Sequence, residues 1–159
     1  MKNIPLCKPS ISDDEIKSVV EVLKSGWITH GPKNHELEEQ FQSYLGVKHA
    51  ITMNSCTSAL HLAVEGLGIE GEVIVPSFTF VASVNAILLA GAQPVLVDIE
   101  EGTRNISPEQ IEQAITDETE AIMVVHFAGL PAAMGKIIEI AQKYNLRIIE
   151  DSAECLGGS

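Results

Sequence analysis

The chain has 159 residues, of which 45% are hydrophobic and 20% are charged, which is typical of one globular domain and not of a disordered segment. Ten Lys and Arg residues against 22 Asp and Glu residues give a formal net charge of -12, so nucleic acid and anionic membrane surfaces are excluded as main partners. The N-terminal sequence MKNIPLCKPSISDDE has no apolar signal segment, and no run is long enough to cross a bilayer, so we expect a cytoplasmic protein.

The first residues of the chain predict two amphipathic helices. Ser12 and Glu15 have the spacing of a capping box, and the helix that they open should end at Gly26. After the loop GWITHGP, a second helix is expected from Pro32 to Gly46. We therefore expect an N-terminal helical segment over residues 1–46.

From residue 47 onward, strand and helix patterns alternate, which predicts a second domain over residues 47–159. Strands are expected at 49–54, 72–76, 94–99, 121–126 and 146–151, with helices at 55–68, 79–91, 108–115 and from about residue 134. This alternation is typical of an α/β fold with a mainly parallel sheet and helices on both faces.

The three cysteines, Cys7, Cys56 and Cys155, have unrelated spacings and are odd in number. This favours reduced thiols over a disulfide framework or a zinc site, and no metal site is expected.

The segment NSCTSAL, residues 54–60, joins a predicted strand to a predicted helix. The amides of Cys56, Thr57 and Ser58 should lie unpaired at the helix N-terminus, which is a suitable place for a phosphate group. Ser55 or Thr57 acting as an N-cap explains the segment equally well. No P-loop motif is present.

Cys56 has two interpretations. A helix N-terminus favours a thiolate, and hence a nucleophile. No base partner can be identified among His49, His61 and His126, so a small, partly buried residue in a turn is the simpler interpretation.

Three further residues are expected at the carboxyl edge of the sheet. His126 and Asp151 end predicted strands, and Phe80 should lie in the first turn of the helix after the 72–76 strand. Each has an ordinary structural explanation, as a cap or a core residue. Their convergence with NSCTSAL predicts a ligand site in which Asp151 faces a cation.

Five motifs in order, namely GWITHGP, NSCTSALHLA, the 71–99 segment, HFAGLP and EDSAECLG, resemble the N-terminal part of the DegT-type sugar aminotransferases. The resemblance runs from about Leu6 to Ser159. It implies a partial large domain of the aspartate aminotransferase fold, pyridoxal 5'-phosphate (PLP) as cofactor, a nucleotide-linked keto sugar and an amino acid donor as substrates, and a homodimer.

The resemblance also implies roles for individual residues. Cys56, Thr57 and Ser58 match the loop that holds the cofactor phosphate, and Phe80 matches the aromatic that stacks on the pyridine ring. Asp151 matches the carboxylate that pairs with the ring nitrogen, and its charge keeps that nitrogen protonated.

Further residues match positions near the ligands. Glu154 matches a position close to the cofactor on the Asp151 side. Trp27, Thr29 and Gly31 match a segment near the substrate entrance, although loop packing explains them equally well, and His126 is a further substrate candidate.

The sequence departs from the family where relatives commonly read P-x-D-M. This chain has Ala133 in place of the acid, and we expect the loss of a helix cap there and not of a catalytic group.

The Schiff-base lysine of the family is expected beyond Ser159, since no lysine of the chain matches it. We therefore expect the 159 residues alone to be inactive. Alternatives are a sugar dehydratase of the same family, in which a histidine replaces the lysine, and a non-catalytic fragment or one half of a split enzyme.

Overall fold

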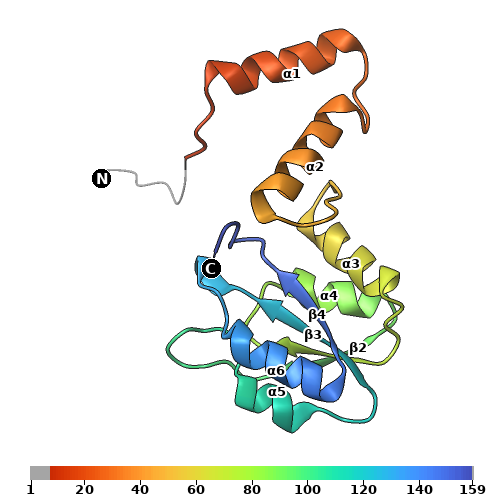
Figure 1. The fold of residues 1–159 in the computed structure, drawn as a ribbon, viewed down its shortest axis with the longest axis vertical. Helices are drawn as coiled ribbons and strands as arrows, with labels where there is room; N and C mark the ends of the chain where they lie inside the picture. The colour runs from red at the N-terminus through yellow and green to blue at the C-terminus, as the bar shows by residue number, and fades with distance from the viewer. Residues whose placement is uncertain (1–7, 159) are drawn as a thin grey trace. The chain divides into compact units, whose positions relative to one another are not determined.

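The computed structural model describes residues 8–158, and Figure 1 shows their helices and strands. The chain forms two compact units, one ending at Thr52 and the other beginning at Met53. The predicted domain boundary between residues 46 and 47 stays a prediction. Cys7 and the two ends of the family resemblance, Leu6 and Ser159, lie outside the described residues. Within the described residues, no helix combines the length and apolarity needed to cross a membrane.

The first unit contains the two predicted helices, α1 (Asp13–Ser25) and α2 (Pro32–Leu45). The predicted capping box is confirmed, since the Ser12 hydroxyl accepts from the first turn of α1 and the Glu15 carboxylate accepts from the Ser12 amide. Both helices end at a glycine in the left-handed conformation, with φ values of 74° at Gly26 and 66° at Gly46.

The second unit alternates helices and strands as expected. Its elements are α3 (Cys56–Gly66), β1 (Glu72–Pro76), α4 (Val81–Leu89), β2 (Gln93–Val97), α5 (Pro108–Ala114), β3 (Thr119–Val125), the short 3-10 turn η1 (Phe127–Gly129), α6 (Met134–Tyr144) and β4 (Arg147–Asp151).

Two details of the predicted elements are wrong. The segment 49–54 is not a strand, because it pairs with no strand among the described residues and its apolar side chains stay exposed, Ile51 at 74%. α4 begins at Val81, so Phe80 is its extended N-cap residue and does not lie in the first helical turn.

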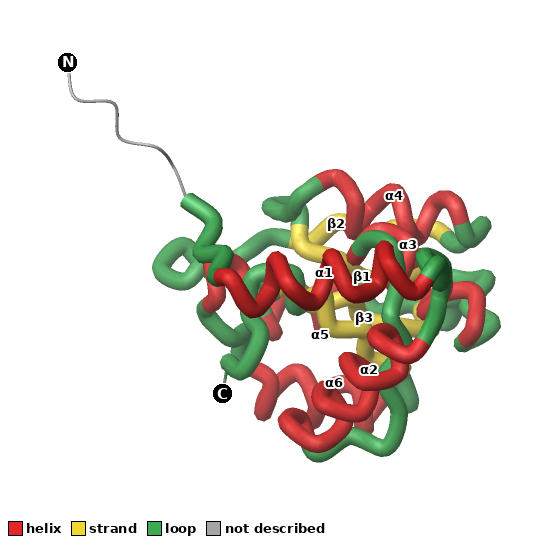
Figure 2. Tube along the Cα trace, turned by 90° about the horizontal axis from the view of Figure 1, so that it is seen from above, coloured by secondary structure: helices red, strands yellow, loops and turns green. Residues whose placement is uncertain are grey.

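The four strands form one parallel sheet in the order β2-β1-β3-β4, with helices on both faces. Side chains alternate between two cores because successive strand residues point to opposite faces. Val73, Val75 and Met123 pack with α3 and α4, whereas Ile74 and Ile122 pack with α5 and α6. Figure 2 shows the strands, in yellow, between α4 and α6.

The strand order places a topological switch point at β1 and β3. The chain leaves β1 toward β2 on one side and returns to β3 on the other. In open parallel sheets, ligands bind outside the carboxyl ends of the strands at such a point. We therefore expect a ligand site among the residues that follow β1, β3 and β4.

Candidate functional site

A pocket of about 560 Å³ lies at these carboxyl ends. Its lining residues come from the start of α3 and from the segments that follow β1, β3 and β4: Cys56, Thr57, Leu60, Phe78, Thr79, Phe80, Ala82, Val125, His126, Phe127, Asp151, Ala153 and Glu154. The structure thus brings six of the predicted site residues into one pocket, although they are up to 98 positions apart (154 minus 56) in the chain.

Asp151 is the buried acid of this pocket, with 7% of its surface exposed. One carboxylate oxygen accepts a hydrogen bond from the Ser83 hydroxyl at 2.8 Å. The other accepts from the Cys56 thiol at 3.6 Å and from the Ala153 amide at 3.3 Å. These three donors fix the orientation of the carboxylate at the end of β4.

The donors around Asp151 are all neutral. Among residues 8–158, no Lys, Arg or His nitrogen lies within ion-pair distance of this carboxylate. A buried carboxylate without a cation is costly, and a cationic group placed in the pocket would stabilise its charge. The arrangement therefore fits a cationic ligand, as the sequence predicts.

Ser55 caps the N-terminus of α3. Its hydroxyl oxygen accepts from the Ser58 amide at 3.1 Å, so the expectation of three free amides is wrong at Ser58. Within the described residues, the amides of Cys56 and Thr57 have no acceptor. The helix start therefore combines a cap with two free donors beside the pocket, and phosphate binding by these donors stays a prediction.

The surroundings of Cys56 disfavour its thiolate form. Burial raises the pKa of its thiol, and the negative charge of Asp151 together with the hydrogen bond to it raises that pKa further. A helix N-terminus acts in the opposite direction, because on its own it favours the thiolate. Cys155 is also a free thiol, buried and donating to the Gly129 carbonyl oxygen.

Aromatic side chains form one wall of the pocket. Phe80 is 78% exposed, so its ring is free to contact a flat ligand. Phe78 and Phe127 pack against each other, with ring centroids 5.0 Å apart. Neither these two residues nor Ser83 was predicted from the sequence as part of the site. The only sequence signal for Ser83 was its position three residues after Phe80, one turn into the same predicted helix.

His126 lines the pocket but is held by its own hydrogen bonds. Its Nδ1 accepts from the Ala132 amide at 3.1 Å, so the proton lies on Nε2, which donates to the Glu150 carboxylate at 2.9 Å. The residue is 5% exposed. This pairing fixes the ring and positions the loop from η1 to Ala132.

Two more side chains hold the same loop. The buried Asn105 accepts from the Phe127 amide and donates to the Leu130 carbonyl oxygen, each at 2.9 Å. Glu154 accepts from the Ala128 amide at 2.9 Å, so this predicted site residue lines the pocket while it also fastens the loop. Asn105 was missed because nothing in the sequence relates residue 105 to residues 127–130.

The three predicted residues of the substrate segment lie in the first unit. Trp27, Thr29 and Gly31 line a separate hollow of about 210 Å³ beside α1 and α2. The indole nitrogen of Trp27 donates to the His30 carbonyl oxygen at 3.1 Å. A side chain at Gly31 would meet that indole, since an added Cβ would lie 2.9 Å from its nitrogen.

The expected cap loss at α6 is also visible. Ala133 is the N-cap residue of this helix, and its side chain makes no capping hydrogen bond.

A pocket of this kind at the switch point of a parallel sheet defines a ligand-binding α/β domain. The sequence matches the DegT/DnrJ/EryC1/StrS aminotransferase family over residues 9–159, and the chain therefore belongs to this family.

Individual relatives show the same likeness. The uncharacterized protein MJ1066 of Methanocaldococcus jannaschii is 48% identical over 156 residues, which are 97% of this chain and 40% of that protein. Spr1654 of Streptococcus pneumoniae, a proposed sugar aminotransferase, was solved in its PLP form. It is 36% identical to this chain, with a TM-score of 0.92, and the alignment covers 98% of this chain and 44% of that chain. The chain thus spans less than half the length of these relatives.

A dehydratase is among the similar structures. GDP-4-keto-6-deoxymannose-3-dehydratase, solved with a trapped PLP-glutamate geminal diamine, is 29% identical with a TM-score of 0.91. The alignment covers 98% of this chain and 42% of that chain. The fold of this part of the family is therefore common to aminotransferases and a dehydratase.

Proposed function

We propose that this chain forms the first part of a PLP-dependent aminotransferase that aminates a nucleotide-linked keto sugar. The observation that carries the proposal is the buried Asp151 carboxylate, which faces the pocket with neutral donors and no cation among residues 8–158. Family membership and the PLP form of a similar structure support the choice of cofactor.

The chain's own residues would hold three parts of the cofactor. The free amides of Cys56 and Thr57 and the Ser58 hydroxyl would bind the phosphate, because a helix N-terminus stabilises an anion. The exposed ring of Phe80 would cover one face of the pyridine. Asp151 would pair with the ring nitrogen, and Ser83 fixes the carboxylate for that contact.

The acid beside the ring nitrogen determines whether that nitrogen is protonated. The Asp151 carboxylate keeps a proton on that nitrogen, because a neighbouring negative charge favours the cationic form. Bound PLP supplies an electron sink for the electron pair left on a substrate carbon after its proton is removed. Overall, the amino acid donor becomes a keto acid while the keto sugar gains the amino group.

Other parts of the proposal concern the whole protein. Trp27, Thr29, Gly31 and His126 are proposed to lie near the sugar substrate, and Glu154 near the cofactor. We also propose that the whole protein is a cytoplasmic homodimer with glutamate or a similar amino acid as donor. The Schiff-base lysine is proposed to belong to a part of the protein outside these 159 residues.

Binding of PLP to the purified chain tests the cofactor site. Equilibrium dialysis should show one PLP per chain, and Asp151→Asn should weaken binding about tenfold or more, since a charged hydrogen bond is lost. Asp98→Asn is the matched control, because Asp98 is an exposed acid after β2 that does not line the pocket. Equal binding by wild type and Asp151→Asn would contradict the proposed role of the acid.

The reaction is tested with the whole protein. Incubation with glutamate and a nucleotide-linked 4-keto sugar should give an amino sugar and 2-oxoglutarate in equal amounts, detected by mass spectrometry. A product that lacks a sugar oxygen and carries no new nitrogen would identify the second candidate, a sugar dehydratase. The similar dehydratase structure is the observation that favours this alternative.

A further inference from the structure

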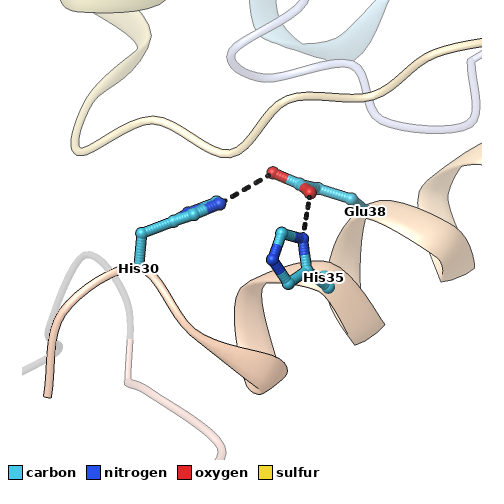
Figure 3. Close-up of side chains that lie close together, drawn as sticks. All are labelled: His30, His35 and Glu38. Atoms are coloured by element: carbon cyan, nitrogen blue, oxygen red, sulfur yellow. Dashed lines mark hydrogen bonds and ion pairs between the residues drawn. The ribbon is translucent and has the colours of Figure 1, made fainter. Parts of the chain in front are cut away.

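The first unit carries a cluster of two histidines and a glutamate that has no part in the pocket of the second unit. His30 lies in the loop before α2, and His35 and Glu38 lie one turn apart on α2 (Figure 3). One nitrogen or oxygen atom from each residue lies within 4.8 Å of the other two. We propose that these three residues bind a divalent transition metal ion, with Zn²⁺ as the best match.

The distances between the three groups suit a tetrahedral ion. His35 Nδ1 is 3.3 Å from one Glu38 oxygen, and His30 Nε2 is 3.7 Å from the other. A tetrahedral zinc ion with bonds of about 2.1 Å holds its ligand atoms roughly 3.4 Å apart. Small side-chain rotations are therefore enough to place all three atoms around one ion.

Figure 3 shows both imidazole rings directed toward the Glu38 carboxylate, which lies between them. The ring centroids are 4.9 Å apart, and the rings stand nearly perpendicular, at 86°. Two neutral imidazoles and one carboxylate form a ligand set that zinc accepts, and it leaves a fourth position for water. The site is thus open on one side, in agreement with the exposed histidine side chains, at 48% and 65%.

The carboxylate is held in place by groups behind it. The amide and the hydroxyl of Thr52 both donate to the same Glu38 oxygen, Oε1, at 2.9 Å. The other oxygen, Oε2, faces His35. Hydrogen bonds of this kind orient metal ligands and commonly contribute tenfold or more to affinity.

The loop that carries His30 is fixed on both sides. Trp27 donates to the His30 carbonyl oxygen at 3.1 Å, and the next amide, that of Gly31, donates to the Asn34 side chain at 3.2 Å. The same Asn34 side chain donates to the Thr52 hydroxyl at 3.3 Å. The histidine and the carboxylate are therefore linked through one polar network, and a bound ion would join this loop to α2.

Zinc binding to the chain, purified without a histidine tag, tests the proposal. Dialysis against Zn²⁺ and metal analysis should give one zinc ion per chain. His30→Ala, His35→Ala and Glu38→Gln should each weaken binding at least about tenfold, and Thr52→Val should do so by a similar factor through the carboxylate. His61→Ala is the matched control, because His61 pairs with Glu65 on a helix but has no third ligand in the described part of the chain.

Substitution by Co²⁺ distinguishes this site from binding to cysteine. The visible spectrum should be that of tetrahedral cobalt with nitrogen and oxygen ligands, and it should be lost in His35→Ala. Sulfur-to-metal charge-transfer bands, or unchanged affinity in both histidine variants, would overturn the proposal. Circular dichroism of each variant checks that the helices remain, which the exposure of both histidines leads us to expect.

Discussion

The thiol sulfur of Cys56 lies 3.6 Å from a carboxylate oxygen of Asp151, although 95 positions separate the two residues in the chain. This contact joins the first turn of α3 to the end of β4. Burial is the largest cause of the raised pKa of Cys56, and this contact raises that pKa further, because the buried carboxylate disfavours a second negative charge beside it.

Removal of that charge should activate the thiol. In Asp151→Asn, the pKa of Cys56 should fall, so at a fixed pH below the pKa a larger fraction is thiolate. The thiolate fraction should rise about tenfold for each unit by which the pKa falls, and alkylation of Cys56 by iodoacetamide should accelerate by a smaller factor. Peptide mapping by mass spectrometry across a pH series measures the rate for each cysteine.

Cys155 is the internal control for this prediction. It is buried and donates to Gly129, with no contact to Asp151, so its alkylation rate should not change. Unchanged or slower alkylation of Cys56 in Asp151→Asn would contradict a contribution of the carboxylate to the raised pKa.

The hydrogen bonds of His126 should contribute unequally to stability. His126→Ala leaves the buried Ala132 amide without its acceptor, which should lower the free energy of unfolding by about 1–3 kcal/mol. Glu150→Gln removes only an exposed charge and should cost less than about 0.5 kcal/mol. Urea unfolding followed by circular dichroism measures both values.

A second substitution at this position separates the hydrogen bond from the packing of the ring. The side-chain oxygen of His126→Asn can accept from the Ala132 amide, so this variant should recover part of the stability lost in His126→Ala. If Glu150→Gln destabilises as much as His126→Ala, the Glu150 pair and not the amide carries the effect.

Gly31 should be required for the position of Trp27. An alanine Cβ at residue 31 would lie 2.9 Å from the indole nitrogen, so in Gly31→Ala the indole must move and lose its bond to the His30 carbonyl oxygen. Trp27 is the only tryptophan of the chain, so its fluorescence reports this change directly. Emission should shift to longer wavelength as the ring becomes more exposed.

Gly66→Ala is the control for that experiment, because a Cβ there meets no atom within 4 Å. Its emission should equal that of the wild type. An unchanged spectrum in Gly31→Ala would mean that the indole does not hold this loop.

Capping and phosphate binding at α3 can be separated at Ser55. Ser55→Ala should lower the free energy of unfolding by about 1 kcal/mol, since the Ser58 amide loses its acceptor. Ser55→Asp can still cap the helix, but its charge should repel a phosphate and weaken PLP binding. Dialysis with PLP and with pyridoxal, which has no phosphate, distinguishes the two effects, because binding of pyridoxal should change little.

The second unit was predictable from sequence because its strands are apolar runs between helices with regular apolar spacing. Residues 72–76 match β1, since a fully buried parallel strand such as Val73–Val75 has no polar residue in it. The prediction of a strand at 49–54 was wrong because alternation of apolar and polar residues does not by itself provide a neighbouring strand. A pattern reports the preference of a segment, whereas a strand also needs a partner for its backbone groups.

Residues of the site could be predicted from the sequence only where they lie at the carboxyl end of a strand. The positions of Asp151 and His126 were predicted in this way, and so was the edge of the sheet at which the pocket lies. The hydrogen bonds of Ser83, Asn105 and Thr52 could not be predicted, because each depends on a side chain that contacts a distant segment. The cluster of His30, His35 and Glu38 was missed for a different reason: its residues are close in the sequence, but only the conformation of the loop before α2 brings His30 to the helix.

The strand order also has a consequence for the order of folding. β4 is the last strand within residues 8–158 and pairs with β3, and the pocket needs its terminal Asp151 as well as the first turn of α3. The pocket is therefore complete only when nearly the whole second unit has folded. A ligand that binds there stabilises the entire unit and not a local segment, so its binding raises the free energy of unfolding of the whole unit.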